Sequence, residues 1–176
     1  MTAEPTRLEP QLEAWIGHFR GPLVGFLASR GATWADAEEL AMDTFAEAWL
    51  GAARRNAAAD DLEAIGGWLR GIAQNLLFAF LRRRRRGPQP MPADDPAVPA
   101  TPTDDRLEPL RAAFAELRPD FQEVLRMHYL EATSAREVAA LLGASPKAVE
   151  SRLYQARRAL RALADKHLRR MEGASR

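Results

Sequence analysis

The residues best suited to do chemistry are the cations between Gly143 and Leu160, in the run GASPKAVESRLYQARRAL. From Lys147 to Arg170 the sequence carries eight basic residues and only two acidic ones. A solvated helix face usually mixes both signs, whereas a one-sided excess favours an anionic partner. We therefore expect a phosphate-bearing polymer as the counterpart, although a solvated basic helix that closes a helical bundle would show the same periodicity.

On a helix with about 100° per residue, the apolar residues of this run form one stripe. They are Val149, Leu153, Ala156, Leu160 and Leu163. Amide, hydroxyl and guanidinium groups near a helix N-terminus suit the DNA major groove, where they contact base edges while flanking arginines contact phosphates. The candidate DNA contacts on the polar side and its flank are Lys147, Ser151, Arg152, Gln155 and Arg158.

Capping and turn residues predict the elements that position this helix. Ser134 and Glu137 have the spacing of a capping box, which begins a short helix. Gly143 suits the left-handed conformation that ends a helix, and Ser145 followed by Pro146 suits the start of the next. Because a core-forming helix precedes them, the pattern is typical of a helix-turn-helix.

An acidic helix is expected between Thr33 and Trp49. Its inward stripe consists of Ala37, Leu40, Ala41, Thr44 and Ala48. The acidic residues left to face outward are Asp36, Glu38, Glu39, Asp43 and Glu47. Taken alone, such a face more often meets solvent than a protein partner.

A third candidate surface lies on the helix expected from Trp68 to Arg86. An aromatic ring stacks on any unpaired base, and amide or guanidinium groups choose among base edges. Arginines also favour the negative end of a helix dipole, and a tryptophan equally suits a core, so a structural role stays open. The candidate contacts for unpaired DNA are Trp68, Asn75, Arg82 and Arg83.

Composition predicts an all-α chain of two small helical domains joined by a Pro/Asp-rich linker, the second domain containing the helix-turn-helix. The linker is expected at residues 87–106, where six of the twelve prolines and four aspartates occur. Proline removes a backbone donor and favours extended geometry in the residue before it. The N-terminal domain is then residues 1–86 and the C-terminal domain residues 107–176.

Several function classes find no support in the sequence. The chain has no cysteine and three scattered histidines, so neither a metal site nor a cofactor is expected. No phosphate-binding glycine loop or nucleophile–base arrangement indicates an enzyme. The N-terminus lacks the order of a signal peptide and no apolar run is long enough to span a bilayer, so we expect a cytoplasmic protein without a membrane segment.

The run RPDFQEVLRMHYLEATSAREVAALLGASPKAVESRLYQARRALRAL resembles the C-terminal promoter-binding domain of bacterial RNA polymerase sigma factors, especially the extracytoplasmic-function group. The group's pattern S-x-x-x-V-x-S-R-L-x-R-A-R is matched from Ser145 to Arg157, with Gln155 where arginine is usual. The run DAEELAMDTFAEAW is similar to the group's core-polymerase-binding helix, with Met42 where glutamine is common. The run GWLRGIAQNLLFAFLRRRRR is similar to the helix that meets the melted minus-ten element.

This resemblance implies a subunit that binds core RNA polymerase, directs it to promoter DNA and assists promoter melting. It implies that the helix beginning at Pro146 contacts the bases of the minus-thirty-five element and that the acidic face contacts polymerase. It also implies that Trp68, Asn75, Arg82 and Arg83 contact the minus-ten strand. The family captures a flipped promoter base near the loop at residues 54–67, in which we assign no pocket. An anti-sigma factor often inhibits this group, although no residue here identifies one. The alternative is an autonomous helix-turn-helix transcriptional regulator, but such proteins usually dimerise and no heptad seam follows Leu163.

Overall fold

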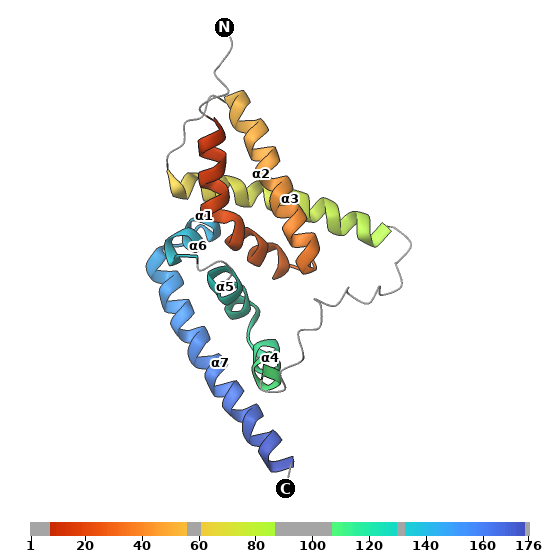
Figure 1. Cartoon of the computed structure of the whole chain (residues 1–176), viewed down its shortest axis with the longest axis vertical. Coiled ribbons are helices and arrows are strands. Elements are labelled where there is room, and N and C mark those ends of the chain that lie inside the picture. Colours follow the sequence, from red (N-terminus) through yellow and green to blue (C-terminus); the bar gives the residue numbers. More distant parts are fainter. Residues whose placement is uncertain (1–7, 56–60, 87–106, 130–132, 175–176) are drawn as a thin grey trace.

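The regular structure of the chain is helical throughout the part that the computed structural model describes, residues 8–55, 61–86, 107–129 and 133–174 (Figure 1). The helices in these ranges are α1 (Leu8–Ala28), α2 (Trp34–Arg55), α3 (Leu62–Arg86), α4 (Glu108–Glu116), α5 (Pro119–Tyr129), α6 (Ala135–Leu142) and α7 (Pro146–Ala174). The expected all-α fold is confirmed. The expected linker, residues 87–106, lies outside the described residues and stays a prediction.

Helices α1, α2 and α3 pack on one another around a core rich in aromatic side chains. Phe19, Phe26 and Phe45 are fully buried there. The inward stripe expected on α2 is confirmed, because Ala37, Leu40, Ala41, Thr44 and Ala48 are all buried. α2 begins where the Thr33 hydroxyl accepts a hydrogen bond from the Asp36 amide at 3.2 Å, which satisfies a donor that the first helical turn leaves open.

Helices α4, α5 and α6 each contact α7, and the apolar stripe of α7 faces them. Val149 and Ala156 are completely buried and Leu153 is nearly so, whereas Leu160 and Leu163 are half-buried. On α5, Met127 is also fully buried. The reason is a second neighbour: the backbone of α1 at Gly25 approaches Met127 so closely that a Cβ on Gly25 would lie 2.8 Å from the Met127 nitrogen.

The N-terminal and C-terminal helices also pack on each other, which the sequence pattern did not predict. α3 lies against α6, and α1 lies against α5 and α6 (Figure 1). At the crossing of α3 and α6, a Cβ on Gly66 would lie 2.6 Å from the carbonyl carbon of Ala140. Among the described residues, an ion pair between Arg30 and Glu123 and a hydrogen bond between His18 and Glu137 also join the halves. One connected hydrophobic core therefore runs through both.

Helix α3 is long and apolar enough, by length and composition alone, to cross a membrane. A core helix of a globular helical protein often has the same length and apolar composition. α3 packs against α1, α2 and α6, with Ile65, Leu69, Ala73 and Leu77 buried among them. These contacts account for part of its apolar composition, whereas Phe78 of the same helix has 69% of its surface exposed.

Candidate nucleic-acid interface

The helix-turn-helix is held by capping interactions at both of its helices. The Ser134 hydroxyl accepts from the Glu137 amide at 3.2 Å, and the Glu137 carboxylate accepts from the Ser134 amide at 2.8 Å. Gly143 ends α6 with φ of +66°, the left-handed region in which glycine is favoured. The Ser145 hydroxyl then accepts from the Ala148 amide at 3.2 Å at the start of α7. The turn expected from the sequence is thus confirmed in its caps and its glycine.

The carboxylate of Glu137 serves a second purpose beside the capping box. Although partial burial acts to raise its pKa, hydrogen bonds from His18 and Ser134 lower the pKa below the ordinary glutamate value. The Glu137 Oε1 to His18 Nδ1 distance is 2.5 Å, so the cap of α6 is tied to α1. The start of the helix-turn-helix is therefore coupled to the N-terminal half.

The first turns of α7 present the predicted DNA contacts to solvent. Lys147, Ser151, Gln155 and Arg158 are exposed, and Arg152 is half-buried at the flank. Tyr154, on the same side, has 67% of its surface exposed and adds an aromatic group to this face. Since the opposite stripe of α7 is buried, the helix holds these polar groups outward on a fixed support.

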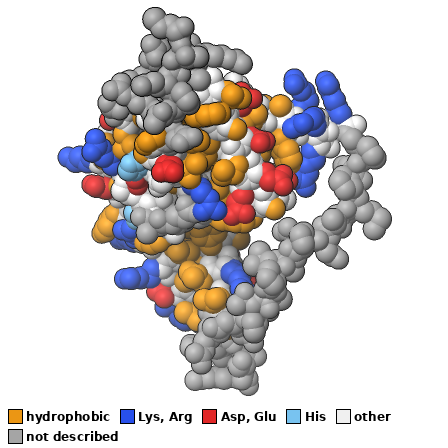
Figure 2. All heavy atoms as spheres, turned by 45° about the horizontal axis from the view of Figure 1, so that its top comes forward, with side chains coloured by type: hydrophobic (Ala, Val, Ile, Leu, Met, Phe, Trp, Pro, Cys, Tyr) orange, Lys and Arg blue, Asp and Glu red, His pale blue; other side chains and the backbone are white. Residues whose placement is uncertain are grey.

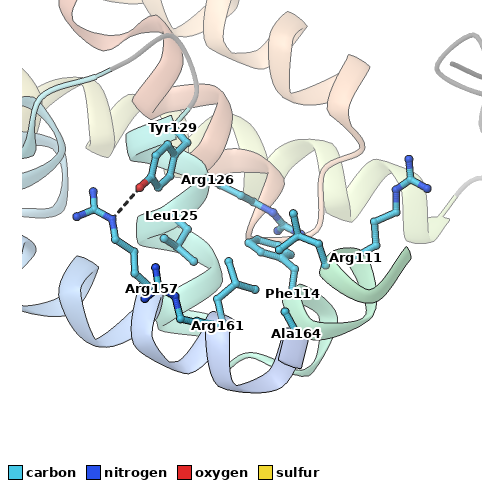
Figure 3. A pocket seen from close by; sticks show the side chains of 10 residues that line it. Arg111, Phe114, Leu125, Arg126, Tyr129, Arg157, Arg161 and Ala164 are labelled. Atoms are coloured by element: carbon cyan, nitrogen blue, oxygen red, sulfur yellow. Dashed lines mark hydrogen bonds between the residues drawn. The ribbon is translucent and has the colours of Figure 1, made fainter. Parts of the chain in front are cut away.

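A groove lies on another side of α7, between it and helices α4 and α5 (Figure 3). Its volume is about 840 Å³, and apolar side chains including Phe114 and Leu125 line it together with several arginines. The Arg157 Nε donates to the Tyr129 hydroxyl at 2.7 Å, and the guanidinium stands over the tyrosine ring. Arg157 therefore turns toward α5, about 100° round the helix from Arg158, and belongs to the groove.

His128 lies half-buried on α5, beside this groove. Burial, and then the positive charge of Arg157, lower the pKa of His128 below its ordinary value. The neutral imidazole is thus the form that the folded chain favours.

The outer face of α2 is acidic and apolar together. Glu38, Glu39 and Asp43 are exposed, and Met42 lies among them with 50% of its surface exposed. Trp49 and Leu50 are further exposed apolar residues of the same helix. Sequence reasoning singled out the acids and Met42 but missed Trp49 and Leu50. Exposed apolar residues among acids are more typical of a protein contact than of a purely solvated face.

Two of the predicted acidic residues differ from the others. Asp36 is half-buried, where it accepts from the Thr33 hydroxyl at 2.6 Å and pairs with Arg84 of α3 at 3.6 Å. Glu47 is exposed but borders a hollow between α2 and α3. Both therefore lie on the side of α2 that faces α3.

That hollow has a volume of about 300 Å³ and brings together two of the residues predicted to contact unpaired DNA, Trp68 and Asn75. Trp68 is half-buried and packs edge-on against Trp15, with ring centroids 5.8 Å apart. The indole is thus held by the core on one side and borders the hollow on another. Gly51, Ile72 and Leu76 complete the lining, and Gly51 was not among the residues predicted from the sequence.

Arg82 and Arg83 are exposed at the far end of α3. In Figure 2 a group of basic side chains projects at the right edge, where α3 ends in Figure 1, with acidic side chains nearer the centre of the same face. Arg82 and Arg83 do not line the hollow around Trp68, so the predicted minus-ten contacts fall into two places along one helix.

Comparison with known proteins identifies the C-terminal half. Residues 107–160 match the protein family described as sigma-70, region 4. This range includes α4, α5, α6 and the first half of α7, and therefore the whole helix-turn-helix.

Two similar proteins extend beyond this region. A probable RNA polymerase sigma factor, RfaY, of Xanthomonas campestris pv. campestris is 34% identical over 138 residues, covering 72% of this chain and 34% of the relative. The RNA polymerase sigma factor CarQ of Myxococcus xanthus is 31% identical over 144 residues, covering 79% of this chain and 80% of the relative. The chain thus spans about a third of the Xanthomonas protein but most of the Myxococcus one. With a capped helix-turn-helix, an outward basic face on α7 and relatives of this kind, the chain belongs to the bacterial RNA polymerase sigma factors, in the extracytoplasmic-function group.

Proposed function

We propose that this protein binds core RNA polymerase in the cytoplasm, directs it to specific promoters and assists their melting, without catalysing a covalent step. The observation that carries the proposal is the face of α7, where Lys147, Ser151 and Arg158 are exposed opposite a buried stripe. A helix supported in this way enters the major groove with its N-terminal side chains toward the bases. In the proposed complex this face reads the minus-thirty-five element.

The polymerase surface proposed here is centred on Glu38, Glu39 and Asp43 of α2, with Met42 between them. The mixture of exposed apolar area and carboxylates supports a protein contact, since apolar burial gives affinity and charge complementarity gives orientation. Asp36 is the weaker candidate of the acidic set, because Thr33 and Arg84 already engage it.

The minus-ten strand is proposed to meet α3 through Trp68 and Asn75, with Arg82 and Arg83 as phosphate contacts. A half-buried indole beside an amide supports this, because stacking on an aromatic side chain is worth about 1–3 kcal/mol per base. Such stacking offsets part of the cost of separating the strands, which is a few kcal/mol per flipped base.

The test is transcription by core polymerase plus the purified chain, on fragments of the source genome. We expect initiation from discrete start sites that depend on the chain. Lys147→Ala combined with Arg158→Ala should reduce this initiation and the salt dependence of promoter binding, because phosphate or base contacts are lost. Arg111→Ala is the matched control: it removes an exposed arginine of α4, away from the face of α7, and should leave initiation unchanged.

Two results would contradict the proposal. The first is unchanged start-site selection in the Lys147 and Arg158 double variant. The second is specific binding of the free chain to DNA as a dimer, with no effect of core polymerase, which is the behaviour of an autonomous regulator. Charge reversal at Glu38 and Glu39 tests the polymerase surface separately, since co-purification with core polymerase should weaken while the helical content stays the same.

A further inference from the structure

The groove between α4, α5 and α7 has no part in the proposed function. Its volume of about 840 Å³ lies within the usual range of small-molecule sites, about 300–1,000 Å³. Such sites are mostly apolar and contain a few polar groups that orient the ligand. This groove has that composition, since Phe114 and Leu125 belong to its apolar walls and its charged side chains are all arginines. It therefore suits a ligand that combines an apolar body with an anionic group.

Two of the arginines come from α7. Arg157 and Arg161 are about one helical turn apart, and both lie at the opposite end of the groove from Arg111 (Figure 3). The Arg157 Nε donates to the Tyr129 hydroxyl at 2.7 Å, which leaves the terminal nitrogens of Arg157 to other acceptors. Within the described ranges, no ion pair or hydrogen bond engages the Arg161 side chain. Two neighbouring guanidinium groups are well suited to bind a carboxylate, because each offers several N–H donors.

The apolar part of the groove follows α7 for about two turns. Its lining positions on α7 run from Arg157 to Ala164, about 10 Å along the axis at about 1.5 Å per residue. An average helix is about 15–20 Å long, so a docked helix would extend well beyond the groove. A single hydrocarbon chain can bend within this length and pack against Leu160, Phe114 and Leu125. The dimensions thus favour a small amphiphile over a helical segment.

We propose that this groove binds a free single-chain amphiphile with an anionic head, of the long-chain carboxylate class. The carboxylate lies against Arg157 and Arg161, and the chain lies toward Phe114 and Ala164. The inference goes beyond the proposed function, because this binding requires neither promoter DNA nor polymerase. The ligand nevertheless lies against the helix that carries Arg158 on the proposed DNA face.

Both parts of the ligand should contribute to its affinity. Complete burial of one methylene group in an apolar site tightens binding by about fourfold. An open groove buries each group only in part, so two added methylene groups should tighten binding by about fivefold or more. The carboxylate gains charge-assisted hydrogen bonds from the arginines, whereas a quaternary ammonium head would be repelled by them.

Isothermal titration calorimetry of the full chain at neutral pH tests the inference with decanoate and dodecanoate, below their critical micelle concentrations. We expect one ligand per chain and a Kd that is about fivefold or more lower for dodecanoate. Decanol has the chain length of decanoate without its charge, and decyltrimethylammonium has the opposite charge. Both should bind at least about tenfold more weakly than decanoate, because a hydrogen bond to a charged group is lost.

The double variant Arg157→Gln with Arg161→Gln removes the cations of the head-group end. It should weaken dodecanoate binding at least about tenfold but keep the preference for dodecanoate over decanoate. Arg169→Gln is the matched control, since Arg169 is an exposed arginine of α7 outside the groove, and it should keep the wild-type Kd. Ala164→Phe fills the apolar part without a change of charge, so it should reduce the preference for the longer chain. Circular dichroism at 222 nm verifies that each variant keeps its helices.

Equal affinity for decanoate and decyltrimethylammonium would overturn the inference, because the arginines would then not select the head group. Unchanged dodecanoate binding in the double arginine variant would overturn it as well. So would the absence of binding by every amphiphile, which is the result expected if the groove accepts only a protein segment. Failure of the proposed function would leave these measurements as they are, because neither DNA nor polymerase takes part in them.

Discussion

Two adjacent glycines of α3, Gly66 and Gly67, should respond to alanine with opposite signs. A Cβ on Gly66 would lie 2.6 Å from the carbonyl carbon of Ala140, 2.7 Å from its oxygen and 2.9 Å from the Leu141 nitrogen. These are backbone atoms of α6, so they cannot turn away as a flexible side chain would. A Cβ on Gly67 would meet nothing within 4 Å.

The magnitudes follow from two competing effects. Replacing glycine by alanine inside a helix stabilises the fold by about 0.5–1 kcal/mol at either position. Forcing an extra methyl group into packed structure costs about 1–3 kcal/mol. Gly67→Ala should therefore raise the free energy of unfolding by about 0.5–1 kcal/mol, whereas Gly66→Ala should lower it by about 1 kcal/mol, the difference between the middles of the two ranges.

Urea denaturation followed by circular dichroism at 222 nm measures both variants against the wild type. A changed midpoint with an unchanged slope reports a change in the free energy of unfolding. A changed slope reports that the two halves no longer unfold together in one transition. The reasoning would be refuted if Gly66→Ala matched or exceeded the wild type in stability. It would also be refuted if Gly67→Ala destabilised the chain as much as Gly66→Ala, because the sign would then not depend on the contact with α6.

Two further predictions concern the helix-turn-helix and its support. Ser134→Ala should lower the free energy of unfolding by about 1 kcal/mol, because the first turn of α6 loses its cap. Ser134→Thr keeps the hydroxyl and is the control. Equal losses of stability in both variants would contradict the capping role. Stability should also fall as the pH drops through about 6.5, the ordinary histidine pKa, because the pKa of His128 is lowered in the folded chain and the unfolded chain binds the proton first. His128→Gln should flatten this part of the stability–pH curve, and an unchanged curve would remove His128 as its cause.

Local chemistry allowed the helix-turn-helix to be predicted from the sequence. Ser134, Glu137 and Gly143 each act within a few residues of their own position, so spacing alone reports the cap and the turn. The buried stripes of α2 and α7 were equally readable, because helical periodicity determines which residues share a face.

Features that depend on contact with a distant segment of the chain could not be predicted from local spacing or periodicity. Met127 is buried by α1, and Gly66 meets α6, across more than seventy residues of sequence. Glu47 looked like one more acid of α2, since only the position of α3 shows that it borders the hollow beside Trp68. Periodicity describes one helix at a time, and these roles arise where two helices meet.

The position of α6 between α3 and α7 limits what the chain can reach in this arrangement. The turn that leads into α7 also lies close to α3, since a Cβ on Gly143 would lie 2.5 Å from the Arg70 Nη1. The two promoter elements are centred about 25 base pairs apart, which at about 3.4 Å per pair is roughly 85 Å. If the two halves contact these elements as proposed, engaging both at once would require α6 to leave α3 and would expose the apolar surfaces that now cover each other. Anything that strengthens or weakens this internal contact would thus tune promoter use from a place that touches neither DNA nor polymerase.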